Sequence, residues 1–202
     1  LNDPLVTSFV FEDREYDIDL SFDTVLDAFD YLNDKTLRDH EKTEICLSLL
    51  LGEQPYDKSK AIDLWNYIYE NFIEMKVEQP VEYDLKGNPI YRKREKDENK
   101  KIIDFEKDAE YIYASFQQAY GMNLYEQQGK LHWHEFRALL NGLPPDTVMQ
   151  RIIQIRLWKP SKYDSEEDRQ KMRELQNFLR LDDAENEKNI ENISGNENKL
   201  KI

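Results

Sequence analysis

Residues 131–136, with the sequence LHWHEF, are the segment whose residue types most resemble a metal site. Two histidines lie beside a glutamate, and imidazole nitrogens and carboxylate oxygens are common zinc ligands. We place the segment on a helix, where the rings of His132 and His134 would point about 200° apart. Zinc-binding helices instead place two histidines four residues apart, on one face. The spacing therefore favours solvent-facing or structural histidines, and we expect no metal.

A second group with suitable oxygen ligands lies between residues 17 and 23. Four residues with side-chain oxygens occupy alternate positions there: Asp17, Asp19, Ser21 and Asp23. The first ligands of a calcium-binding EF-hand loop are spaced in this way, but such a loop also needs a glycine at its sixth position and a bidentate glutamate at its twelfth. Those positions are Phe22 and Ala28, so we interpret the four residues as polar faces of a hairpin and of a capped helix.

No residue is placed by the sequence as a catalytic group. Cys46 lies between two apolar neighbours and has no basic neighbour to stabilise a thiolate, which indicates a buried core cysteine. The chain has no nucleophile elbow, no P-loop and no dinucleotide-binding glycine motif, and it contains only six glycines. We therefore predict that the chain is not an enzyme and needs no cofactor.

A charge-dense run at residues 92–101 holds six basic residues against three acidic ones. The basic residues are the candidate partner-binding residues of the chain: Arg92, Lys93, Arg94, Lys96, Lys100 and Lys101. They could contact nucleic acid or an acidic protein surface. No aromatic residue is interleaved for base stacking, so a solvated, flexible loop is the favoured interpretation. Residues 1–34, by contrast, carry ten acids and one base, which suits a basic partner or simply a soluble surface.

The composition of the 202 residues narrows the class of protein. A net charge of −14 argues against a general DNA or RNA binder, because phosphate contacts need a positive field. Aromatic residues make up 12% of the chain, too much for a protein that is disordered throughout. A single cysteine fits a reducing cytoplasm. No apolar run approaches the roughly 18 to 20 residues of a membrane span, so we expect no membrane partner.

Hydrophobic periodicity predicts mainly helical structure. An apolar run at residues 9–11 and an alternating stretch at residues 16–20 predict a β-hairpin. Ser21 is a favourable N-cap for a first helix, and Gly52 is expected to end a second. Apolar stripes predict further helices over residues 61–75, 109–120, 131–141, 144–160 and 165–181. The helix expected after Pro144 has apolar residues around much of its circumference, so we place it centrally.

The fold class predicted from these elements is mainly α. We expect a multi-helix single domain over residues 1–181 with a small N-terminal β-hairpin, followed by a disordered C-terminal tail at residues 182–202, which are rich in Asn and Glu. Residues 77–103 are expected to form an exposed charged loop with a short hairpin around residues 86–88.

Four segments in the second half of the chain together resemble a known protein family. They are IDF at residues 103–105, DAEYIYASF at 108–116, YGMNL at 120–124 and LHWHEFRALLNGL at 131–143. In these segments the chain is similar to a family of small proteins from siphophages, a group of tailed phages, that infect Gram-positive bacteria. The similarity spans about residues 9–181, so the tail at residues 182–202 lies outside it.

The resemblance implies a product of the tail region of a siphophage genome, encoded between the major tail protein and the tape measure protein. Such a protein would act in the host bacterial cytoplasm as a tail assembly chaperone or accessory factor. Its partner would be the tape measure protein, and the major tail protein is a further candidate. A structural protein of the finished tail is the alternative, and a nucleic-acid-binding regulator is a third. The family offers no catalytic residue to carry over, and the sequence leaves self-association open.

Overall fold

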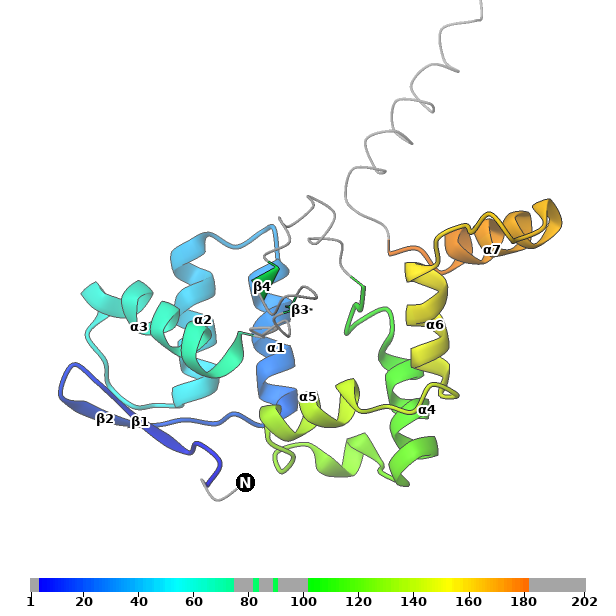
Figure 1. Cartoon of the computed structure of the whole chain (residues 1–202). Helices are drawn as coiled ribbons and strands as arrows, with labels where there is room; N and C mark the ends of the chain where they lie inside the picture. The colour runs from blue at the N-terminus through cyan, green and yellow to red at the C-terminus, as the bar shows by residue number, and fades with distance from the viewer. Residues whose placement is uncertain (1–3, 75–81, 84–88, 91–101, 182–202) are drawn as a thin grey trace, which may run out of the picture. The chain divides into compact units, whose positions relative to one another are not determined.

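The computed structural model of the chain describes residues 4–74, 82–83, 89–90 and 102–181 (Figure 1). The fold is mainly helical with an N-terminal antiparallel hairpin, which confirms the predicted fold class. The chain divides into two compact units. Unit 1 comprises Leu1–Glu95 and Tyr120–Gly142, and unit 2 comprises Lys96–Ala119 and Leu143–Ile202. A single folding domain over residues 1–181 therefore stays a prediction.

The hairpin of unit 1 joins β1 (Ser8–Phe11) to β2 (Arg14–Asp17) in antiparallel register. Its two-residue turn has positive φ at both positions, 47° at Glu12 and 62° at Asp13. A type I′ turn requires this backbone, because its twist matches the right-handed twist of the two strands. Non-glycine residues adopt it at some cost, so tertiary contacts of the hairpin must hold the turn in place.

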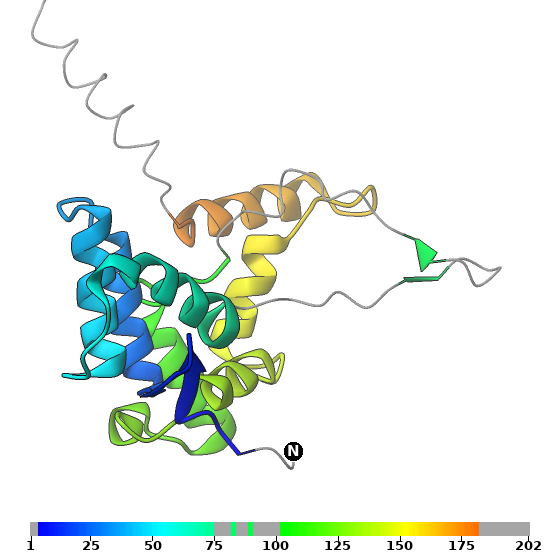
Figure 2. The ribbon, with the colours of Figure 1, turned by 90° about the vertical axis from the view of Figure 1, so that its left-hand side faces the viewer.

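The helices of unit 1 are α1 (Phe22–Asn33), α2 (Asp39–Leu51), α3 (Ala61–Ile68) and α5 (Trp133–Asn141). The 3₁₀ turn η1 (Lys58–Lys60) precedes α3, and the π-helical turn η2 (Tyr69–Ile73) follows it. α1 and α2 lie side by side, and α3 packs on α2 (Figures 1 and 2). Gly52 follows α2 with a φ of 63°, a conformation that glycine adopts without strain, which confirms the predicted helix end.

The start of α5 is tied to the start of α1 by a short backbone bridge. The N–H of Phe22 donates to the carbonyl of Leu131 (2.9 Å), and the N–H of Trp133 donates to the carbonyl of Leu20 (2.7 Å). Trp133 and Phe136 are fully buried, as the sequence predicts. Segments more than 100 residues apart in the sequence therefore share one core.

Unit 2 contains α4 (Ala109–Tyr120, apart from its last residue), α6 (Val148–Leu157) and α7 (Glu166–Phe178). The prediction of a central helix that begins at Pro144 is wrong. Thr147 is the N-cap of α6, and the hydroxyl of Thr147 donates to the carbonyl of Pro144 (2.7 Å). Only two residues of α6 are buried, because within unit 2 it has neighbours on part of its circumference only.

The short hairpin predicted around residues 86–88 is confirmed, since β3 (Glu82–Tyr83) pairs antiparallel with β4 (Pro89–Ile90). Most of the predicted loop at 77–103 and the predicted tail at 182–202 lie outside the described residues. No helix in the described ranges is long and apolar enough to cross a membrane.

Candidate partner-binding surface

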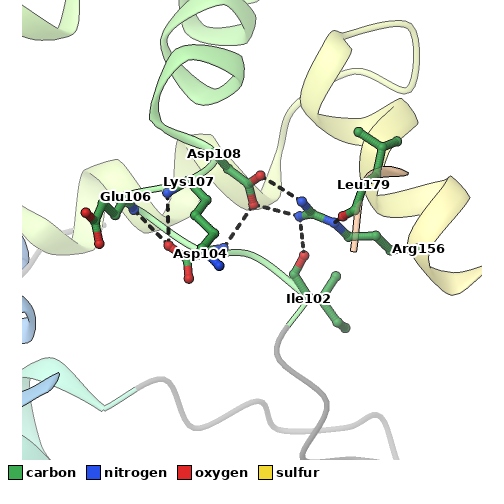
Figure 3. Close-up of polar contacts among 7 residues, drawn as sticks. All are labelled: Ile102, Asp104, Glu106, Lys107, Asp108, Arg156 and Leu179. Atoms are coloured by element: carbon green, nitrogen blue, oxygen red, sulfur yellow. Dashed lines mark hydrogen bonds and ion pairs between the residues drawn. The ribbon is translucent and has the colours of Figure 1, made fainter. Parts of the chain in front are cut away.

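The side chain of Arg156 on α6 holds together three separate segments of unit 2 (Figure 3). Its guanidinium makes two charge-assisted hydrogen bonds to the carboxylate of Asp108, of 2.6 and 2.8 Å. It also donates to the carbonyls of Ile102 and Leu179, both at 2.8 Å. The Leu179 carbonyl lies just past the end of α7, where a helix leaves its carbonyls without intrahelical partners. Arg156 therefore fixes the C-terminal end of α7.

The carboxylate of Asp108 is held in position by the turn before α4. One oxygen of Asp108 accepts the N–H of Asp104 (2.9 Å), and the carboxylate of Asp104 accepts the N–H groups of Glu106 and Lys107 (3.1 and 3.0 Å) (Figure 3). The side chain of Asp108 is 1% exposed and that of Arg156 is 9% exposed. A buried pair of this kind is tolerated because both groups have their hydrogen bonds satisfied.

One side of α7 packs on α6, and the contact is largely polar. The four partly buried residues of this side are spaced three, four and three apart: Arg169, Met172, Gln176 and Leu179. The amide of Gln176 donates to the carbonyls of Ile155 (2.9 Å) and Trp158 (2.8 Å) at the end of α6. No residue of α7 is fully buried. Hydrogen bonds to backbone carbonyls, rather than core packing, hold this helix.

The neighbouring side of α7 is apolar and exposed. Leu175 is 43% exposed and Phe178 is 82% exposed. At 100° per residue these two side chains lie about 110° around the helix from the side that packs on α6. The sequence places Met172, Leu175, Phe178 and Leu179 in one thin apolar stripe, and the structure splits that stripe between two sides of the helix. We call Leu175 and Phe178 the α7 apolar side.

Buried apolar side chains and charge are distributed unevenly between the units. Among the described residues of unit 2, only five apolar side chains are buried, which are Ile112, Phe116, Leu143, Met149 and Ile152. Its described residues include 10 acids and 9 bases, whereas those of unit 1 include 20 acids and 8 bases. Unit 2 is therefore nearly neutral and has a small core. It also exposes Val148, Leu157 and Tyr163 besides the α7 apolar side.

The two histidines of the LHWHEF segment are structural. His132 is the N-cap of α5, outside the helix proper, so its ring is stacked on that of His134 at 5.5 Å instead of pointing away from it. Nδ1 of His132 accepts the N–H of His134 (3.1 Å), and Nε2 faces the carbonyl of Val6 (3.2 Å). Both ring nitrogens of His132 are thus occupied. The expected 200° separation was wrong because the helix begins two residues later than predicted, at Trp133, and His132 precedes it.

Partial burial lowers the pKa of His134, and the positive charge of Arg137 lowers it further. The unfolded chain takes up this proton near pH 6.5, before the folded protein does. We therefore expect the free energy of unfolding to fall as the pH drops from 7.5 through 6.5 to 5.5. Urea titrations at these pH values should show a weaker pH dependence for His134→Gln.

The control for this experiment is His40→Gln, because His40 is exposed on α2. Equal pH dependence in the wild type and His134→Gln would contradict the prediction.

The other sequence candidates take structural positions. Cys46 is fully buried, and its burial raises the pKa of the thiol to about 11, which disfavours the nucleophilic thiolate. The carboxylate of Asp19 accepts the N–H of Ser21 (2.9 Å), and that of Asp23 accepts the N–H of Gly129 (2.9 Å). Across the described part of the chain, no three His, Cys, Asp or Glu side chains are grouped to hold a metal.

The candidate partner-binding residues of the basic run lie outside the described residues: Arg92, Lys93, Arg94, Lys96, Lys100 and Lys101. Their predicted role is untested by the structure. Conversely, the exposure of the α7 apolar side was not predicted from the sequence. The only available signal was the high charge of this helix, with seven charged residues among the thirteen from Glu166 to Phe178.

Comparisons with known proteins place the chain in a phage context. Among curated proteins and among solved structures, no match was found. A family model with the description Bacteriophage Gp15 protein matches residues 1–181, up to the segment just beyond α7.

Proposed function

The chain belongs to the Bacteriophage Gp15 protein family, and from this premise we propose that it is a non-enzymatic tail assembly chaperone or accessory factor. Its client would be a phage tail protein, first of all the tape measure protein, bound in the host bacterial cytoplasm. The observation that carries the proposal is the exposure of the α7 apolar side. Phe178 is 82% exposed there, on a helix that has no buried residue. Apolar surface of this kind commonly marks a protein-binding site.

The chemistry of this surface favours an amphipathic helix as the bound segment. A long helical client with an uncovered apolar stripe aggregates unless another protein covers that stripe. Leu175 and Phe178 are one helical turn apart, so together they can contact a client stripe whose apolar residues recur every three to four positions. Burial of such side chains is worth about 1.5 to 3 kcal/mol each. Unit 2 is nearly neutral, so the contact does not depend on charge.

The test is co-expression with the tape measure protein, followed by measurement of soluble client and by pull-down. We expect the double variant Leu175→Ser with Phe178→Ser to weaken binding at least about tenfold, because the lost apolar contacts are worth more than 1.4 kcal/mol. The fold should be retained, since both side chains are exposed. The matched control is Ile62→Ser, which removes an exposed apolar residue (56%) from α3 in unit 1.

A salt series distinguishes binding through the α7 apolar side from binding through the basic run. Binding through apolar contacts should survive moderate salt, whereas binding through residues 92–101 should weaken steeply and disappear when that run is deleted. Client that stays insoluble on co-expression, together with detection of this chain in mature particles, would contradict the chaperone proposal. That result would favour the alternative, a structural component of the tail. Salt-sensitive binding of nucleic acid through the basic run would support a regulator instead.

A further inference from the structure

The hairpin of unit 1 has one open edge, and its register identifies which backbone groups face outward. The N–H of Ile18 donates to the carbonyl of Thr7 (2.9 Å), so these two residues form a hydrogen-bonded pair. Such pairs alternate along an antiparallel ladder, which makes Ser8 and Val10 members of non-hydrogen-bonded pairs. Their N–H and C=O groups therefore point away from β2, toward the outer edge of β1.

At Asp17, the outer edge of β2 is covered by a side chain. The N–H of Asp17 donates to the amide oxygen of Gln54 (2.9 Å), and the amide nitrogen of Gln54 donates to the carbonyl of Asp17 (2.8 Å). The side-chain amide thus satisfies both outward groups of Asp17, as a paired strand would. Three of the four residues of β2 are also charged, a usual protection of an edge strand.

β1 has neither protection. Its four residues are uncharged, Val10 is 58% exposed, and within the described ranges no hydrogen bond engages the outward backbone groups of Ser8 and Val10. The opposite face of the strand is anchored, since Phe9 is buried and stacks on Tyr16 (5.6 Å). β1 is therefore a rigidly held, open strand edge, the kind of template to which an extended peptide can add by β-augmentation.

We propose that the outer edge of β1 binds an extended segment of a partner protein that carries Lys or Arg side chains. The charge of unit 1 selects such an occupant, because its described residues include 20 acids and 8 bases. Cross-strand neighbours share a face, so Glu15 and Asp17 lie on the same face as Val10 and Ser8. A long basic side chain on an added strand reaches these carboxylates. A second copy of β1 has no basic residue to offer, and its pairing would bring two acidic units together.

The test uses a defined probe, an eight-residue capped peptide of alternating lysine and threonine, added at millimolar concentration to the isotope-labelled full chain. We expect the largest amide chemical-shift changes in the spectrum at Ser8 and Val10, with at least about twofold slower hydrogen exchange at both. The matched peptide of alternating glutamate and threonine has the same length and should produce neither effect, because the acidic unit repels it.

The variant Val10→Pro removes an N–H that the hairpin ladder does not use, so the fold should persist while peptide binding is lost. Val10→Thr keeps this N–H and should bind as the wild type does. If the proline variant does not fold, Val10→Lys provides the second test, since its charge should repel the lysine peptide and lower its binding. Equal responses to the two peptides, or full binding by Val10→Pro or by a folded Val10→Lys, would overturn the proposal. A doubled mass without peptide, lost in Val10→Pro, would assign the edge to a second copy and overturn it as well.

Discussion

Replacement of Asp108 with alanine is expected to lower the free energy of unfolding by about 3–5 kcal/mol. The guanidinium of Arg156 would then remain buried without its counter-charge, at 9% exposure of the side chain. Asp108→Asn keeps the side-chain volume and isolates the loss of charge, and it should also be strongly destabilising. Urea denaturation followed by circular dichroism measures both effects.

The control for this experiment removes both charges. The double variant Asp108→Leu with Arg156→Met should be more stable than Asp108→Ala, because no unpaired charge is left in the interior. Hydrogen exchange of the α7 amides should be faster in every variant that lacks Arg156, since Arg156 donates to the carbonyl of Leu179. A cost below about 1 kcal/mol for Asp108→Ala would show that the pair is solvated and would contradict the prediction.

Replacement of Phe136 with alanine is expected to cost about 3–5 kcal/mol of unfolding free energy in unit 1. The ring is 1% exposed and is stacked between Phe22, at a centroid distance of 4.9 Å, and Trp133, at 5.7 Å. Truncation therefore removes the contacts of two aromatic neighbours and leaves a cavity between α1 and α5. A loss of this size is comparable to the whole stability of a marginal domain.

Phe178→Ala is the matched control, because it truncates the same residue type where the ring is 82% exposed. It should change the free energy of unfolding by less than about 0.5 kcal/mol. A neutral result for Phe136→Ala would indicate that its stripe is a surface and not a core.

Asp108→Ala and Phe136→Ala together also test the predicted single domain over residues 1–181, because Asp108 belongs to unit 2 and Phe136 to unit 1. In a single cooperative domain both would lower the midpoint of one common thermal transition. In two separately folding units each would shift a different transition.

Much of the local structure could be predicted from the sequence alone. The apolar spacing identified the helices, and Ser21 holds the predicted N-cap position of α1, although its side chain makes no capping hydrogen bond. Gly52 ends α2 because few other residues adopt its φ of 63°. The stripe that includes Trp133 and Phe136 was correctly assigned to the core. These features depend on residues within a few positions of each other, where backbone preference and periodicity decide the outcome.

Only the tertiary structure decided which neighbours cover each stripe. Asp108 and Arg156 are 48 residues apart, and no local pattern in the sequence predicts that they pair. The periodicity of α7 groups Met172 with Leu175 and Phe178, yet only Met172 is partly buried, on the side where Gln176 donates to the end of α6. Likewise, Gln54 covers the outer edge of β2 at Asp17, whereas no described residue pairs with the outer edge of β1. Periodicity determines which residues share a face, whereas burial of that face depends on elements that are distant in the sequence.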